Sequence, residues 1–388
     1  MKTKPSIWLM ISLIMFPQIV ETIYSPALPH IARGFDVSAV LASQTLSVYF
    51  SAFAVGVLVW GIVSDYLGRR TTMLLGLAVY GVAAIGAMFA NSFEHLMIMR
   101  ALSAFGAAVG SVVTQTMLRD SYDGVSLGKV FTYMGIGISL SPVIGMMSGG
   151  IIAEQSGYQG VFLALSILAL LLFAVCLRTL PETKPNSVER QSIIQLAVTI
   201  SKDAALWRSA ILVACFNIML FSYYLQGPFI FDNLGYSSDE FGQSGLVLAL
   251  GTLLGSLVSK KLLGAVRFGI HIDSDALVKL AALLAIVGST GVYWMQGSLW
   301  FLVPMLLIVM AFGIGMPNVL SHALVRYKDQ VGSAGALFGM MYYVLIGSGL
   351  AVVGVVQNLG MTLLAVSIVA VVLVTTLSFD KAYSLSTK

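Results

Sequence analysis

The stretch IWLMISLIMFPQIVETIYSPAL, residues 7–28, carries one full charge, Glu21. Its other twenty-one residues are apolar, small, hydroxylic or amide. A helix rises about 1.5 Å per residue, so a run of this length crosses the ~30 Å hydrocarbon core of a bilayer. A charge at the bilayer centre costs about 2.5 to 3.5 kcal/mol on insertion scales, which makes a carboxylate at this depth a functional candidate. The alternative is a protonated, hydrogen-bonded glutamic acid with a structural role.

The composition of the whole chain agrees with this local pattern. Of 388 residues, 58% are hydrophobic and only 10% are charged, which excludes a water-soluble surface and indicates a polytopic membrane protein. The net charge of +4 is spread over many loops, so we expect no nucleic-acid partner. Cys176 and Cys215 both lie inside apolar runs, so we expect neither a disulfide framework nor a metal site, and no cofactor.

Twelve apolar runs are long enough to span a membrane, and they predict an all-α membrane protein with twelve transmembrane helices. The first run follows Lys2 and Lys4 and has the shape of a signal peptide, but it is too long, so we interpret it as an uncleaved span. The predicted spans are residues 6–28, 38–61, 72–91, 95–117, 128–153, 158–179, 206–231, 240–263, 275–296, 299–325, 333–357 and 360–379.

The basic residues predict the orientation of these spans. With a cytoplasmic N-terminus, all of the 21 Lys and Arg residues lie in cytoplasmic segments except Arg33, which lies outside, and Arg100, which lies within a span. Such a positive-inside bias predicts that both termini are cytoplasmic.

The longest polar interruption, residues 181–205, predicts a cytoplasmic linker between a bundle at 1–180 and a bundle at 206–388. An offset of 207 residues also superposes Phe105 and Gly106 on Phe312 and Gly313, and Arg119 on Arg326. Parallel repeats of this kind predict two pseudo-symmetric six-helix bundles with a substrate site at their interface.

The loop after the second span reads GIVSDYLGRR and contains Gly61, Asp65, Gly68, Arg69 and Arg70. It resembles the G-x-x-x-D-x-x-G-R-R signature of the major facilitator superfamily. The glycines permit a tight turn, and the charges can pair with one another and with helix ends, so we expect a cytoplasmic gate. The alternative is that the two arginines act only as topology signals.

Further motifs are similar to the Bcr/CflA branch of that superfamily, with EmrD-type exporters the most similar. Residues 22–29, TIYSPALP, are similar to the D-M-Y-L-P-A-L-P segment of the branch. Arg100 begins a pattern similar to R-x-x-Q-G-x-G-A-A of drug:proton antiporters, and Pro142, Gly149 and Gly150 resemble a loosened antiporter motif. The usual acid of the first helix aligns with Thr22, one residue after Glu21.

The resemblance implies proton coupling through Glu21 and Arg100, and helical spacing indicates which side chains line a cavity. On the first span, Gln18 lies three residues before Glu21 and is the expected hydrogen-bond partner of its carboxyl group. For most of the aromatic side chains, helix packing is the alternative role. The predicted substrate-binding residues are Gln18, Glu21, Tyr24, Gln115, Asn217, Phe221, Tyr224, Phe338 and Tyr342.

We therefore expect a proton-coupled exporter (antiporter) of small lipophilic or cationic drugs, a monomer in the inner membrane of a bacterium. The alternative is a dedicated exporter of a metabolite such as a siderophore or a sugar. A membrane-embedded enzyme needs acid/base or metal-binding groups clustered at one depth, whereas the histidines are scattered over span ends and loops, so we expect no enzyme.

Overall fold

The structure is a computed structural model that describes residues 4–185, 193–267 and 270–376. The extreme ends of the two predicted bundles, and residues 186–192 of the predicted linker, lie outside these ranges. The chain divides into two compact units, one of Met1–Ile194 with Tyr236–Gln243 and one of Gln195–Gly235 with Ser244–Lys388. The predicted bundle boundaries at 180 and 206 stay predictions.

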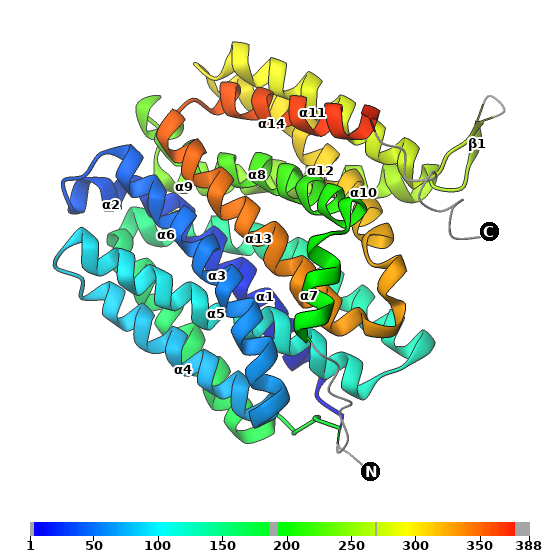
Figure 1. Cartoon of the computed structure of the whole chain (residues 1–388). Coiled ribbons are helices and arrows are strands. Elements are labelled where there is room, and N and C mark those ends of the chain that lie inside the picture. The colour runs from blue at the N-terminus through cyan, green and yellow to red at the C-terminus, as the bar shows by residue number, and fades with distance from the viewer. Residues whose placement is uncertain (1–3, 186–192, 268–269, 377–388) are drawn as a thin grey trace. The chain divides into compact units, whose positions relative to one another are not determined.

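The first unit is built almost entirely of long apolar helices (Figure 1). Helix α1 packs on α5 and α6, α3 packs on α5, and α4 packs on both α5 and α6. Two of these helices begin at serine caps, since the Ser38 and Ser92 hydroxyl oxygens accept backbone N–H groups three residues on. The elements are α1 (Ile7–Tyr24), η1 (Ser25–Ala27), α2 (Leu28–Gly34), α3 (Ala39–Leu67), α4 (Arg69–Met88), α5 (Phe93–Ser121), α6 (Gly124–Thr179) and α9 (Ser238–Gln243).

Helix α6 contains both the fifth and the sixth predicted span. Its 56 residues are far more than one crossing needs, because a straight helix of that length would measure about 84 Å against a core of about 30 Å. The helix is interrupted at Gly157, whose φ of 62° and ψ of −165° are not helical. The interruption lies between the predicted spans at 128–153 and 158–179.

The second unit contains the remaining helices and one short hairpin. Helix α8 packs on α12, α13 and α14, while α11 packs on α12 and α14. Strands β1 and β2 pair antiparallel between α10 and α11. The elements are α7 (Ile193–Ser201), α8 (Ala204–Asn233), α10 (Gly245–Leu262), β1 (Val266–Arg267), β2 (Ile270–His271), α11 (Ser274–Met295), η2 (Leu299–Phe301), α12 (Leu302–Ala323), η3 (Val325–Gln330), α13 (Val331–Val356) and α14 (Leu359–Thr376).

The lengths of these helices confirm the predicted fold class. In the described part of the chain, ten helical segments are long and apolar enough to cross a membrane, and α14 supplies a shorter apolar helix. Because α6 holds two crossings, the total is the predicted twelve. The chain is an all-α membrane protein.

Candidate functional site

Glu21 lies near the end of α1, in the interior of the first unit, where it is 2% exposed. Neither of its carboxyl oxygens has a hydrogen-bond partner among the described residues. A buried polar group without a partner is costly, and a buried charge is far more so. The carboxyl group is therefore not held by the structural hydrogen bonds that the alternative interpretation requires.

Arg100, on α5, is the largest fully buried side chain of the described chain. Its guanidinium carbon lies 3.8 Å from the centre of the Tyr24 ring and 4.6 Å from the centre of the Tyr49 ring. The guanidinium nitrogens have no hydrogen-bond partner within the described ranges. Cation–π contacts of this kind contribute about 2 kcal/mol when desolvated, so the two rings compensate part of the cost of burying the charge.

Arg100 lies against the ring of Tyr24, three residues after Glu21, but Glu21 and Arg100 form no ion pair among those that the structure describes. The two charges thus lie in one interior region while each keeps its hydrogen-bonding capacity free. This arrangement can change its partners when a proton binds or leaves, because an ionised carboxylate attracts the guanidinium more strongly than a neutral acid does.

Close packing of α1 on α5 brings together the two helices that carry Glu21 and Arg100. Pro17 lies inside α1, and Gly110 of α5 lies against it. A Cβ atom on Gly110 would meet the Leu13 carbonyl oxygen at 2.7 Å, so only glycine permits this approach. The backbones of the helices that carry Glu21 and Arg100 are therefore in close contact.

Three residues around this region were not predicted from the sequence. Tyr49 of α3 has a buried hydroxyl group without a hydrogen-bond partner in the described residues, and Tyr80 of α4 is buried with its ring edge-on to Phe16 of α1. Thr45 fixes Tyr24, because the Tyr24 hydroxyl donates to Thr45 Oγ1 at 2.9 Å and Thr45 donates to a backbone carbonyl. The spacing of Thr45 and Tyr49 places them on one face of α3, but only the fold shows which neighbours that face meets.

The predicted hydrogen bond between Gln18 and Glu21 does not form. Gln18 is only partly buried, whereas the Glu21 carboxyl lies in the interior without a partner in the described residues. Gln115 also lies apart from Arg100, since fifteen residues of α5 separate them by about 22 Å. Tyr24 is in the predicted region, but its ring faces Arg100 and its hydroxyl is bonded to Thr45.

The glycines of the predicted antiporter motif position α1. Helix α6 contains Pro142, and a Cβ atom on Gly149 would overlap the backbone of Ile23. Gly145 lies equally close to the side chain of Thr22, the residue after Glu21. Gly150 lies against the backbone of α9, where a Cβ atom would meet the Ser238 carbonyl oxygen at 2.6 Å. The motif thus keeps α6 in close contact with the end of α1 that carries the carboxylate.

The predicted site residues of the second unit lie on α8 and α13 and carry no charge, and the aromatic ones form one ring pair on each helix. The ring centres of Phe221 and Tyr224 are 5.5 Å apart, and those of Phe338 and Tyr342 are 5.4 Å apart. Asn217 donates from Nδ2 to the Val213 carbonyl oxygen at 2.8 Å, one turn back on α8. Since α8 and α13 pack on each other, these side chains belong to neighbouring helices.

The glycine- and arginine-containing loop forms a charged cluster around Arg69. The Arg69 side chain is buried and pairs both with Asp65, one turn back, and with Asp120 of α5 at 2.8 Å. Gly68 adopts a φ of 91°, and a Cβ atom there would overlap the Glu182 carboxylate. The predicted pairing of opposite charges is present, but Asp65 does not cap a helix.

Glu182, just after α6, occupies the N-terminus of α4 instead. Its carboxylate oxygens accept the backbone N–H groups of Arg69 at 2.8 Å and Arg70 at 3.1 Å. Burial raises the pKa of Glu182, but the backbone donors of Lys184, Arg69 and Arg70 outweigh burial and hold the pKa below its usual value. The charge and the free donors of a helix N-terminus favour an ionised carboxylate at this place.

Comparisons with known proteins agree with this fold and these motifs. The model of the Major Facilitator Superfamily matches residues 10–352. The chain belongs to the major facilitator superfamily. An uncharacterized transporter of Rickettsia felis is 31% identical over 364 residues, covering 88% of this chain and 87% of that protein. Multidrug resistance protein D of Escherichia coli is 25% identical, covering 88% of this chain and 86% of that protein.

A solved structure supports the same fold for this major facilitator superfamily member. The crystal structure of a D-xylose-proton symporter matches with a TM-score of 0.76 at 13% identity, covering 95% of each chain. The family match confirms the predicted superfamily and identifies a membrane transporter rather than an enzyme. The drug-resistance relatives agree with the predicted Bcr/CflA, EmrD-like branch.

Proposed function

We propose that this transporter is a proton-coupled exporter of small lipophilic or cationic compounds, working by alternating access in a bacterial inner membrane with both termini cytoplasmic. The observation that carries the proposal is the buried pair of free charges, Glu21 without a hydrogen-bond partner in the described residues and Arg100 on the faces of two tyrosine rings. Intramembrane charges of this kind mark proton relays and ion pathways in many transporters.

The chemistry of these groups supports two arrangements. When Glu21 is protonated it needs no cation, and Arg100 stays on the rings of Tyr24 and Tyr49. When Glu21 is ionised, an uncompensated buried charge costs several kcal/mol, so Arg100 turns toward the carboxylate. Proton binding then favours one packing of α1 against α5, and loss of the proton favours the other.

The predicted substrate-binding side chains of the second unit support the proposed substrate class. Asn217 is the only amide in the predicted substrate set of the second unit, and the others are aromatic, which suits lipophilic compounds of varied shape. Aromatic faces also attract cations. Several relatives carry names of drug-resistance proteins, including multidrug resistance protein D and a chloramphenicol resistance protein of Pseudomonas aeruginosa that is 27% identical.

The energy available sets a limit on accumulation. One proton moving inward gains about 2.3 kcal/mol per 100 mV and about 1.4 kcal/mol per pH unit. Exchange of one proton for one monovalent cation moves no net charge, so only the pH term remains, equivalent to about tenfold accumulation per pH unit. A neutral compound is expected to be driven more strongly than a cation.

The experiment uses the full chain purified into liposomes with an imposed pH gradient and a fluorescent lipophilic cation. The expected result is substrate movement driven by the gradient and accompanied by proton flux in the opposite direction. In Glu21→Gln the amide mimics the protonated acid permanently, so pH-driven movement is lost while the protein still inserts.

The matched control is Glu94→Gln, because Glu94 is an exposed acid at the start of α5. This variant should transport as the unaltered protein does. Proton-coupled transport that persists in Glu21→Gln would contradict the role of Glu21, and absence of any proton movement with a broad compound panel would contradict the proposal itself.

A further inference from the structure

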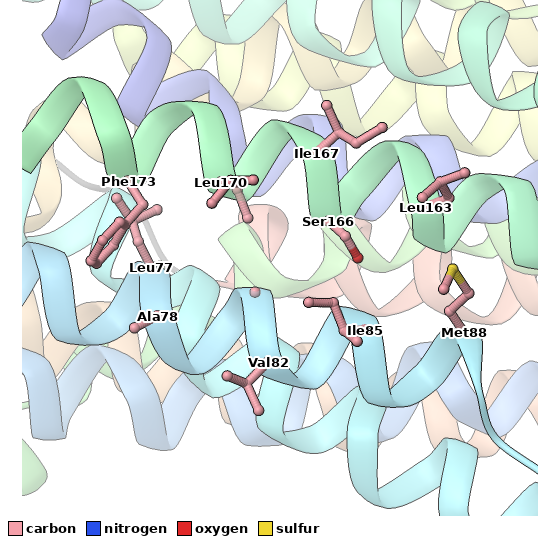
Figure 2. Close-up of a pocket in the computed structure, with 12 residues that line it drawn as sticks. Leu77, Ala78, Val82, Ile85, Met88, Leu163, Ser166, Ile167, Leu170 and Phe173 are labelled. Carbon is pink, nitrogen blue, oxygen red and sulfur yellow. The ribbon is translucent and has the colours of Figure 1, made fainter.

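An apolar groove runs along the outside of the first unit, between α4 and the second half of α6 (Figure 2). Leu77 and Ala169 are buried and form its floor, while Val82 and Leu170 are among the most exposed side chains of their helices. Figure 2 shows Leu77 and Phe173 near one end and Met88 with Leu163 at the other. The lining residues are Leu77, Ala78, Gly81, Val82, Ile85, Met88, Leu163, Ser166, Ile167, Ala169, Leu170 and Phe173.

The chemistry of the lining admits only an apolar ligand. No charged residue lines the groove, and Ser166 is its one polar side chain. The Ser166 hydroxyl donates to the Phe162 carbonyl oxygen at 2.8 Å within its own helix, so its proton is already used. A drug-like compound with polar groups to satisfy would find no donor for them here.

The position of the groove points to lipid rather than water. Helices α4 and α6 are both membrane spans, so the exposed side chains of Val82, Ile167 and Leu170 contact hydrocarbon. From Leu77 to Met88 the lining extends over eleven residues, or about 16 Å along the helix. That length is close to half of the ~30 Å core, which is the depth of one leaflet.

The volume of the groove is about 370 Å³. At the floor the two helices meet, because a Cβ atom on Gly81 would lie 3.8 Å from Ala169 Cβ, an ordinary van der Waals contact.

We propose that this groove is a lipid site that binds one acyl chain of a phospholipid from the leaflet at the Met88 end of α4. The driving force is contact rather than transfer from water, because a lipid tail is apolar in either place. An empty groove forfeits dispersion contacts along its walls, and a chain lying in it restores them. The headgroup lies beyond Met88, near the exposed polar residues Asn91 and Ser92.

The bound chain supports the inner face of the same helix. Tyr80, one residue before Gly81, is buried, and its ring packs edge-on against Phe16 of α1 with the ring centres 4.7 Å apart. A lipid chain packed against the outer face of this turn opposes outward movement of α4. We expect the site to stabilise the first unit in a bilayer more than in detergent.

The test uses the full chain in nanodiscs of phosphatidylethanolamine and phosphatidylglycerol, with a trace of phosphatidylethanolamine that carries a diazirine in the middle of one acyl chain. After illumination, labelled peptides are located by mass spectrometry. Labelling of the lining segments in α4 and α6 should exceed labelling around Ile98 and Leu102, exposed positions of α5, by several-fold.

Two variants fill the groove from opposite walls, Gly81→Phe on α4 and Ser166→Leu on α6. Either should reduce labelling of the groove to the level of the α5 reference, so the test survives if one of them fails to fold. Ile98→Phe adds a ring at an exposed site outside the groove and should leave groove labelling unchanged.

Three outcomes would overturn the proposal. Uniform labelling that neither groove variant reduces would mean ordinary boundary lipid. Loss of labelling together with cross-linked dimers would assign the surface to a second copy of the chain. Displacement of the labelled lipid by a transported cation would assign it to substrate.

Discussion

The two units of this transporter differ most in the chemistry of their interiors. The first unit buries Glu21 and Arg100 within its membrane helices. In the second unit, Gln226 and Asn318 are buried along the spans and carry no charge, while the buried charges Arg208 and Asp275 lie near the starts of α8 and α11 and pair with each other at 3.8 Å. A neutral amide can be satisfied by one or two hydrogen bonds, whereas a buried charge responds to every proton that arrives. Under the proposed function, proton sensing belongs to the helices of the first unit that carry Glu21 and Arg100, and the second unit contributes shape and contact.

The ends of α3 and α10 also differ in this way. In the first unit, Arg69, just after α3, is held by the carboxylates of Asp65 and Asp120. In the second unit, Ser259 in the last turn of α10 accepts a hydrogen bond from Asn318 Nδ2 at 2.8 Å. Ion pairs that are partly buried break at a high cost, and a neutral pair breaks at a lower one. The Arg69 cluster is therefore expected to be more sensitive to loss of a polar group than the contact between Ser259 and Asn318.

The largest effect is expected from moving the acid between the units. Glu21→Gln should reduce pH-driven transport to background, and the double variant Glu21→Gln with Asn217→Asp should not restore it. The new acid would belong to α8 of the second unit, whereas Arg100 and the two tyrosine rings that hold it belong to the first. Liposome transport under a pH gradient measures both variants, and recovery in the double variant would break the proposed division of roles.

Next in size is the comparison of Arg69→Met with Asn318→Ala. Loss of Arg69 leaves Asp120 largely buried without its partner, which should cost about 3 to 5 kcal/mol of stability. Loss of the Asn318 amide removes two neutral hydrogen bonds, to Ser259 Oγ and to the Ile314 carbonyl oxygen, and should cost about 1 to 3 kcal/mol. Unfolding in mild detergent, followed by intrinsic fluorescence, gives the two values. Equal losses of stability would show that the ion pairs of Arg69 stabilise the fold no more than the neutral hydrogen bonds of Asn318 do.

Tyr49→Leu should have a smaller effect, of about 1 to 2 kcal/mol on the balance between the two arrangements of Arg100. Without this ring the guanidinium favours the ionised Glu21, so transport should require a lower external pH to protonate the carboxylate. Tyr49→Phe keeps the aromatic face and serves as the control. The pH profile of transport is the readout, and identical profiles for the leucine variant and the unaltered protein would remove Tyr49 from the site.

The smallest effect is expected at Glu182. A carboxylate whose pKa is lowered by folding adds stability above its unfolded value, and that contribution disappears as the pH falls through the folded value. Glu182→Gln should therefore cost about 0.5 to 1 kcal/mol at pH 7, and the difference should fade below about pH 4. Chemical unfolding at the two pH values tests this. A pH-independent difference would mean that the charge is not what the α4 N-terminus uses.

The sequence predicted the features that depend on local pattern. Apolar length predicted the spans, the isolated carboxylate at Glu21 predicted a buried acid, and glycine spacing around Asp65 predicted the charged loop. Helical spacing failed for Gln18, since a residue three positions away shares a face but need not point at the same neighbour. Spacing on a helix fixes direction only to within a broad sector.

Contacts between distant segments were beyond sequence reasoning. Glu182 meets the start of α4 across more than one hundred residues, and the contact depends on the positive φ of Gly68. Tyr49 joins Arg100 because α3 and α5 pack closely. Nothing in the local pattern around Tyr49 distinguishes it from an ordinary packing aromatic.

The interruption of α6 has a consequence for how the chain enters the membrane. Only residues 154–157 connect the two spans, so the connection is too short to hold them apart during insertion. The two halves of α6 must enter together as a helical hairpin, because neither can wait in water while the other is threaded. The surroundings of Gly157 are open, with no atom within 4 Å of a built Cβ, so only the handedness of its backbone restricts the residue there. The site would therefore accept a D-alanine more readily than an L-alanine.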